Sequence, residues 1–245
     1  MKFGILGYGY VGKATHKGIV KDNSASIFDT ASHNTEEQYK DLVSCDTVFI
    51  CIPTVTDKDI DIIIDEIKKL KKEGVSSIII RSTLPLGAND KIQESVGEVI
   101  YIPEFLRERY WETDCLKRPL IIGCNGNVPD WLKKEDHMIC SHKEAELVKM
   151  FSNNYNVVRI AFANAFYDLS QNVGANYDVV KDMYLAVAQK QTYLNMPGYD
   201  GSRGFGGKCL PKDLDFLINT LDDLNLEHDW FKTIRELNKG WSNKL

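Results

Sequence analysis

The glycine-rich stretch Gly7-Tyr8-Gly9-Tyr10-Val11-Gly12 constrains the fold more than any other part of the chain. An apolar run at 2–6 predicts a strand before it, residues 13–20 can continue as a helix after it, and a second apolar run at 26–29 ends in an acid. This order is the βαβ fingerprint of dinucleotide-binding proteins, whereas a glycine-rich turn in an unrelated α/β protein is the alternative. The predicted cofactor-binding residues are Gly7, Gly9, Tyr10, Val11, Gly12 and Asp29.

Asp29 also predicts which dinucleotide binds. A carboxylate at the end of the second strand accepts hydrogen bonds from the ribose 2′-hydroxyl and repels a 2′-phosphate. The sequence therefore favours NAD over NADP as the cofactor.

Further strands are predicted by apolar runs at 47–52, 77–80, 98–102, 119–123 and 138–140, and the apolar spacing at 59–72 predicts a helix between two of them. We expect an α/β fold with an N-terminal, doubly wound parallel sheet of the Rossmann type. Ligands of such sheets bind beyond the carboxyl ends of the strands. Four polar residues follow predicted strand ends and indicate a site at that edge, although each alone is compatible with an ordinary turn: Asp29, Thr54, Thr83 and Glu104.

The second half of the chain reads as helical. Ser141 and Glu144 form a capping box that predicts the start of a long helix reaching about residue 171, with further helices at 177–191, 213–224 and 230–238. We expect an NAD-binding domain over 1–141 and an all-α domain over 142–245. Lys149 and Asn153 are four residues apart and share one helix face, where a solvated face is the alternative. An apolar stripe along the same helix favours a homodimer.

One loop combines glycines, a thiol and cations. It reads Gly204-Phe205-Gly206-Gly207-Lys208-Cys209-Leu210-Pro211-Lys212-Asp213. Proline suits the first turn of a helix, and a cysteine at a helix N-terminus beside two lysines favours the thiolate. The hypothesis is a nucleophilic Cys209, and an incidental buried cysteine in a glycine loop is the alternative.

Composition excludes several classes of function. The net charge of −5 leaves no basic footprint for nucleic acid. We expect no membrane span and no signal peptide, because apolar runs are short and the N-terminus is glycine-rich. The six cysteines have no metal-ligand spacing, so no metal is expected, and their use as apolar residues indicates a reducing, cytoplasmic compartment.

Five motifs, in order along the chain, resemble the UDP-glucose dehydrogenase family of nucleotide-sugar dehydrogenases. They are the stretches 7–12, 82–87 (Ser-Thr-Leu-Pro-Leu-Gly), 103–108 (Pro-Glu-Phe-Leu-Arg-Glu), 146–153 (Glu-Leu-Val-Lys-Met-Phe-Ser-Asn) and 204–213. The resemblance implies two NAD-dependent oxidations that convert a sugar C6 alcohol into a carboxylate, with UDP-glucose as the expected substrate and UDP-glucuronate as the product.

The resemblance also implies a role for each matching residue. Cys209 would be the nucleophile that forms a thiohemiacetal and then a thioester. Lys149 and Asn153 would stabilise oxyanion charge, Glu104 and Asp213 would work with water and protons, and Thr83 would lie near the reacting centre. Thr54, Thr83 and Glu108 would contact the cofactor. The implied substrate contacts are Glu104, Phe105, Leu106, Lys149, Asn153, Gly204, Phe205 and Gly206.

Members of that family carry a third domain that grips the uridine diphosphate. We expect this chain to be a truncated form without it, since the sequence ends where the link would begin, and a separate chain could replace the domain. Two other functions stay open. One is a hydroxyacid dehydrogenase of the 6-phosphogluconate type, which has no use for a nucleophilic cysteine. The other is a non-catalytic NAD-binding subunit.

Overall fold

The computed structural model describes residues 1–31, 39–54, 56–187, 205 and 210–242. Its contacts divide the chain into two compact units, Met1–Tyr155 and Asn156–Leu245. We call them the sheet unit and the helical unit and describe each by itself. Helix α6 (His142–Asn172) contributes residues to both. The domain boundary expected at 141 and 142 stays a prediction.

The sheet unit is built on seven strands in the order β2-β1-β3-β4-β5-β6-β7. Neighbouring strands pair in parallel except β5 and β6, which are antiparallel. This confirms the α/β fold of the Rossmann type. The strands are β1 (Phe3–Leu6), β2 (Ala25–Phe28), β3 (Thr47–Ile50), β4 (Ser77–Ile80), β5 (Ile100–Tyr101), β6 (Leu120–Gly123) and β7 (His137–Cys140).

One strand pair, β5 and β6, is antiparallel within the otherwise parallel sheet. The segment between β5 and β6 holds only the single turn η3 (Glu108–Tyr110) and the short helix α5 (Trp111–Asp114). A parallel neighbour needs a crossover that packs back onto the sheet, usually a full helix. Two short turns do not provide one, so β6 enters from the opposite direction and pairs with β5 at Tyr101 and Gly123.

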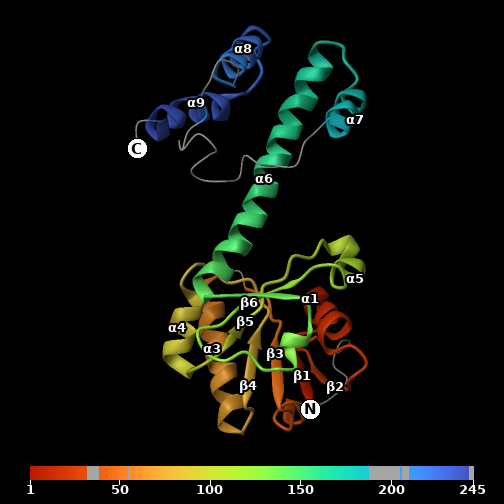
Figure 1. The fold of residues 1–245 in the computed structure, drawn as a ribbon, viewed down its shortest axis with the longest axis vertical. Coiled ribbons are helices and arrows are strands. Elements are labelled where there is room, and N and C mark those ends of the chain that lie inside the picture. Colours follow the sequence, from red (N-terminus) through yellow and green to blue (C-terminus); the bar gives the residue numbers. More distant parts are fainter. Residues whose placement is uncertain (32–38, 55, 188–204, 206–209, 243–245) are drawn as a thin grey trace. The chain divides into compact units, whose positions relative to one another are not determined.

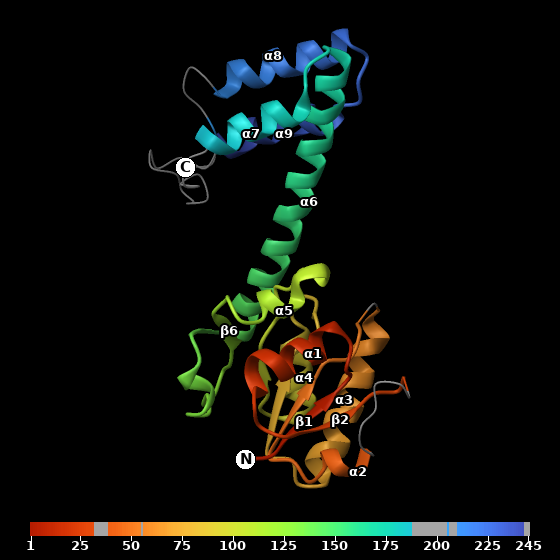
Figure 2. The same cartoon turned by 90° about the vertical axis from the view of Figure 1, so that its right-hand side faces the viewer.

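Helices cover both faces of the sheet (Figures 1 and 2). One face packs on α2 (Tyr39–Leu42), α3 (Asp57–Lys72) and α4 (Ala88–Val96), and the other on α1 (Tyr10–Thr15) and the π-helical turn η1 (His16–Val20). A further turn, η4 (Leu132–Lys134), belongs to the second face. The apolar residues of α3 that predicted a helix are the ones that are buried: Ile60, Ile63, Ile64, Ile67 and Leu70.

Helix α6 begins where its capping box predicts. The backbone N–H of Ser141 donates to the Glu144 carboxylate at 2.8 Å, and the N–H of Glu144 donates to the Ser141 hydroxyl at 3.3 Å. His142 is buried next to this start, and its Nε2 lies 3.1 Å from the carbonyl oxygen of Val99. The first turns of α6 are therefore tied to the sheet.

The helical unit also contains α7 (Tyr177–Val187), α8 (Leu210–Asp223) and α9 (Asp229–Ser242). These confirm the predicted helices over the described residues, while 188–191 lie outside them. Helix α8 starts earlier than predicted, with Pro211 in its first turn, where no amide N–H is needed. Among the described residues of the helical unit the core is small: Ile218, Leu221 and Phe231 are buried. Among the described residues, no helix is long and apolar enough to cross a membrane.

Candidate active site

The three fingerprint glycines have three different surroundings. Gly7 has a φ of +90°, and a Cβ there would lie 2.6 Å from the carbonyl oxygen of Cys51. A Cβ on Gly12 would collide with the carbonyl oxygen of Gly7, whereas one on Gly9 would meet no heavy atom within 4 Å. A pyrophosphate-binding turn requires a tight backbone turn, an open approach for the pyrophosphate and close packing of the helix on the strand. The turn therefore fits a dinucleotide.

Asp29 follows β2 and lies against this turn. One of its carboxylate oxygens accepts from the backbone N–H of Tyr8 at 2.5 Å, and the other accepts from Ala31 at 2.8 Å. Tyr10 and Val11 open α1, and Gly9 of the turn is its N-cap. The described geometry thus brings the acid, the glycines and the helix start together.

The loops after β3 and β4 are joined by side-chain hydrogen bonds. The Thr54 hydroxyl donates to the carbonyl oxygen of Thr83, and the Ser82 hydroxyl donates to that of Ile52 at 2.7 Å. Ser82 is buried and was not among the predicted site residues. These bonds hold the two predicted site threonines, Thr54 and Thr83, next to each other at the carboxyl edge of the sheet.

Lys149 and Glu104 form a buried ion pair. The Lys149 Nζ donates to the Glu104 carboxylate at 2.7 Å and to its backbone carbonyl at 2.6 Å. Their side chains are 6% and 14% exposed, so the solvated-face alternative for Lys149 is wrong. The other carboxylate oxygen accepts from the N–H of Leu106 at 2.7 Å, and the Phe105 ring lies 5.5 Å from Nζ. An ammonium has three donors and the described residues accept from two of them, so a third is available to a ligand oxygen.

A cavity of about 340 Å³ lies between the start of α6 and the loops after β3 and β4. Four of the predicted site residues line it: Thr54, Thr83, Lys149 and Asn153. Glu104 is connected to it through Lys149. The structure therefore gathers residues from three distant stretches of the sequence around one space.

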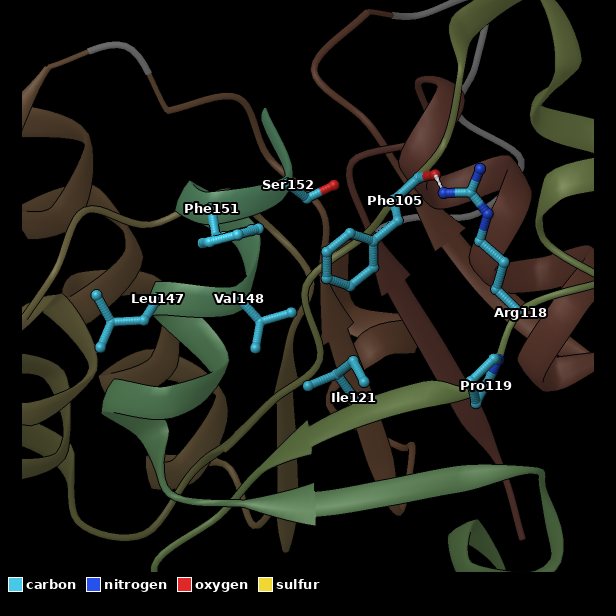
Figure 3. Close-up of a pocket in the computed structure, with 8 residues that line it drawn as sticks. All are labelled: Phe105, Arg118, Pro119, Ile121, Leu147, Val148, Phe151 and Ser152. Carbon is cyan, nitrogen blue, oxygen red and sulfur yellow. Dashed lines mark hydrogen bonds between the residues drawn. The ribbon is translucent and has the colours of Figure 1, made fainter. Parts of the chain in front are cut away.

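An apolar groove of about 460 Å³ lies on another side of α6 (Figure 3). Phe105 reaches into it toward Val148 and Phe151, and Arg118 donates to the Phe105 carbonyl oxygen. Phe151 is 59% exposed. The groove is lined by Phe105, Arg118, Pro119, Ile121, Leu147, Val148, Phe151 and Ser152.

Glu146 has a structural role that the sequence motif did not reveal. Its side chain is buried, and its carboxylate accepts from the N–H of Gly87 at 2.7 Å and from the N–H and side-chain amide of Asn89, each at 2.8 Å. Gly87 is the N-cap of α4 and has no side chain to cap it. Glu146 therefore caps α4 from a different helix and holds α6 beside the loop that carries Thr83.

Several predicted site residues lie outside the described part of the structure. These are Gly204, Gly206 and Cys209, together with the side chains of Glu108 and Asp213. Phe205 is described, and it exchanges two hydrogen bonds of 2.8 Å with the side-chain amide of Asn238 on α9.

Four of the described cysteines are poor nucleophiles. Burial raises the pKa of Cys51 to about 11, and burial also raises the pKa of Cys115, Cys124 and Cys140. A thiol with a raised pKa is protonated near neutral pH and reacts slowly. No disulfide joins the described cysteines, and the described residues contain no cluster of three metal-ligand side chains.

The chain matches two domains of one protein family. Residues 17–135 match the NAD-binding domain of the UDP-glucose/GDP-mannose dehydrogenase family, and residues 143–240 match its central domain. The two matches follow each other as the fold does, sheet first and helices second.

Individual relatives carry the name UDP-glucose 6-dehydrogenase. The protein from Campylobacter jejuni is 27% identical over 98% of this chain and 72% of its own length. The one from Rhizobium meliloti is 29% identical over 62% of this chain, and the match covers only 38% of the relative. The chain spans about half the length of the Rickettsia typhi relative.

A solved structure supports the fold. GDP-mannose dehydrogenase from Pseudomonas aeruginosa superposes with a TM-score of 0.79 at 20% identity, over 98% of this chain and 69% of that one. Fold, sequence motifs and domain order agree, and the chain belongs to the UDP-glucose/GDP-mannose dehydrogenase family, with its NAD-binding domain followed by its central domain.

Proposed function

We propose that the chain oxidises the C6 alcohol of a nucleotide sugar to the uronic acid in two NAD-dependent steps, with UDP-glucose as the substrate and UDP-glucuronate as the product. The observation that carries this proposal is the buried Lys149–Glu104 pair beside Thr83 and Asn153, at the edge of the sheet that holds the fingerprint turn. The names of the relatives favour UDP-glucose.

The first oxidation needs a hydride acceptor and a place for the alcohol proton. NAD supplies the hydride acceptor when it is bound along the turn at Gly7 and Asp29. Negative charge develops on the C6 oxygen as its proton leaves and is used up as hydride departs, and a donor already held in place stabilises this alkoxide without reorganisation. The remaining N–H of Lys149, together with Asn153, is suited to this, and the proton passes through water at the open side of the cavity.

The second oxidation needs a covalent partner, because an aldehyde carbon gives up hydride readily only after a nucleophile has added. In the proposal the Cys209 thiolate adds to the aldehyde and forms a thiohemiacetal. Loss of a second hydride to a second NAD gives the thioester. Water then adds, the carbon–sulfur bond breaks, and the carboxylate and the thiol are released, with Glu104 and Asp213 positioning the water. The loop residues Gly204, Phe205 and Gly206 are the proposed contacts of the sugar, together with Phe105 and Leu106.

The type of product and the number of NADH formed per product distinguish this function from the two alternatives, a hydroxyacid dehydrogenase and a non-catalytic subunit. Purified chain is incubated with NAD and a panel of sugars, with and without UDP attached, while NADH and product are measured. The proposal expects two NADH per acid formed with UDP-glucose. One NADH and a ketone would instead indicate a hydroxyacid dehydrogenase, and NAD binding without any reduction would indicate a non-catalytic subunit.

The proposed assembly is a homodimer that covers the exposed apolar face of α6. Phe151, Val158 and Phe162 are each more than two-fifths exposed on that helix. Exposed apolar patches of this kind mark interaction surfaces. Sedimentation of the wild type should give a dimer, and Phe151→Glu should shift it toward monomer. A monomeric wild type at micromolar concentration would contradict the dimer, and a separate protein supplying uridine-diphosphate contacts would then be the partner to seek.

A further inference from the structure

Arg81 is a buried cation at the ligand edge of the sheet. It follows β4 directly and is 5% exposed. Burial lowers the pKa of its guanidinium, and the nearby Cys51 and Glu104 act in the opposite direction. Among the described residues, no carboxylate lies within ion-pair distance of it. A buried charge without a paired carboxylate is less favourable than an apolar side chain of similar size, so stability alone does not account for an arginine here.

One side of Arg81 is bound to the cofactor helix. Its Nε donates to the Thr15 hydroxyl at 3.1 Å. That hydroxyl in turn donates to the carbonyl oxygen of Val11 at 2.7 Å. Thr15 is fully buried in the last turn of α1, and Val11 belongs to the fingerprint at its first turn. Arg81 therefore reaches the beginning of α1 through a single hydroxyl.

The other side of Arg81 is bound to the segment that carries Glu104. Its Nη1 donates to the carbonyl oxygen of Ile102 at 3.0 Å. Pro103 and then Glu104 follow, and Glu104 holds Lys149 at 2.7 Å. A small cavity of about 30 Å³ is lined by both Arg81 and Glu104, so the guanidinium lies on the inner side of this segment.

We propose that Arg81 is a positioning residue that couples the cofactor-binding helix to the Glu104–Lys149 pair. The path runs from Val11 through Thr15 and Arg81 to Ile102. Its two ends belong to elements that do not follow each other in the chain, and the planar guanidinium joins them through two of its fixed donors. For the role of Lys149 and Glu104 the inference rests on the proposed function. For the role of Val11 and α1 it rests on the match to the NAD-binding domain.

The test removes the hydrogen bond between Arg81 and the Thr15 hydroxyl by a substitution that keeps the side-chain volume. Thr15→Val keeps the side-chain volume and deletes the hydroxyl, and Thr15→Ser keeps a hydroxyl at this position. The control is Thr47→Val, which makes the same change at a buried threonine that begins β3, at the end of the strand away from the proposed ligand edge. Arg81→Met keeps most of the packing without the charge. For each protein the NAD dissociation constant is measured by calorimetry without any sugar, together with the thermal midpoint.

We expect Thr15→Val and Arg81→Met to weaken NAD binding by about tenfold, as the loss of a hydrogen bond to a charged group would. Thr15→Ser should bind within about twofold of the wild type, and Thr47→Val should change the thermal midpoint without changing NAD affinity. If Thr15→Val and Thr47→Val bind NAD equally well, Arg81 is only structural and the inference fails. NAD binding is measured without turnover, so this result is independent of whether a sugar is oxidised. Should Arg81→Met not fold, Thr15→Val decides alone.

Discussion

In the sheet unit, residues 1–155, several charged side chains are buried and each has a partner. Arg81 bonds to Thr15, Glu146 caps α4, and Lys149 binds Glu104. In the helical unit, residues 156–245, several apolar side chains are exposed instead. Helix α7 buries none of its residues, and its most exposed apolar residues, each more than three-fifths exposed, are Met183, Tyr184, Leu185 and Val187.

The difference shows that the two units are stabilised in different ways. Buried polar groups are tolerated when every one has a partner, and they then specify one arrangement of the elements around them. In the sheet unit, the buried charged side chains of Arg81, Glu146 and Lys149 have such partners next to the proposed ligand edge. The described residues of the helical unit form a small core and expose a large apolar surface, which indicates that the stability of this unit depends on contacts beyond that core.

Separating the two units tests this comparison most directly. A fragment of residues 1–155 should unfold cooperatively and bind NAD, because its core and its fingerprint turn are complete. A fragment of residues 156–245 should show no cooperative transition, since three buried apolar side chains among its described residues are too few for an independent domain. Circular dichroism melts and calorimetry check both. A cooperative melt of the second fragment as a monomer would break the comparison.

Cys209→Ala should abolish acid formation and leave NAD affinity within a few-fold. The thiol is needed only for the second oxidation, whereas the cofactor residues belong to the sheet unit. Product analysis and NAD titration measure the two effects separately. Iodoacetamide labelling of the wild type should be fastest at Cys209 and slowed by substrate.

Cys140→Ala is the matched control for the thiol, because burial raises the pKa of Cys140 and it should not react. Two NADH per sugar at the wild-type rate from Cys209→Ala would rule out the covalent mechanism. The family membership would then describe the fold and the cofactor, not the chemistry.

Lys149→Ala should lower turnover by about a hundredfold or more, as loss of a donor to a developing oxyanion does. Its control is Lys143→Ala on the same helix, where the lysine is exposed and pairs with Asp90. Steady-state kinetics and thermal melts are compared for both. A small loss of activity together with a large drop in the melting temperature would make Lys149 a structural residue of the sheet unit.

Asp29→Ala should reduce the preference for NAD over NADP by about tenfold, because repulsion of the 2′-phosphate disappears along with the ribose contact. Asp22→Ala, an exposed carboxylate after η1, is the control. Titrations with both cofactors provide the measurement. Equal affinity of the wild type for NAD and NADP would remove Asp29 as the source of selectivity.

The smallest effect is expected at Asp114. Its buried carboxylate accepts from Arg107, and these hydrogen bonds hold the pKa of Asp114 well below its usual range. A lowered folded-state pKa stabilises the protein above the ordinary carboxyl pKa and loses that effect as the pH falls toward the folded value. Asp114→Asn should therefore lower the melting temperature by a few degrees at pH 7.

The difference between Asp114→Asn and the wild type should shrink once the pH falls below about 4, where the unfolded carboxyl takes up its proton. Melting curves from pH 7 to pH 3 test this sign. A difference that grows on acidification would show that the Arg107 contact does not set the pKa.

Much of the fold follows from local sequence pattern. The apolar spacing of α3, the capping box of α6 and the strand-turn-helix order at Gly7 are each recognisable within about a dozen residues or fewer, because backbone geometry imposes these periods on any chain. The parallel pairing of β1 to β5 brings the polar residues that follow these strands to one edge of the sheet, and a ligand site there stays a prediction.

Only the tertiary structure decided which residues far apart in the chain are in contact. Nothing near Glu146 indicates that it caps α4, nothing near Arg81 indicates that it joins α1 to Ile102, and the reversal of β6 depends on what its connection can cover. Lys149 could have faced solvent by its helical spacing, yet it is buried against Glu104. Local pattern determines which elements form, but packing decides which side chains meet, because a buried polar group finds its partner wherever the fold has placed one.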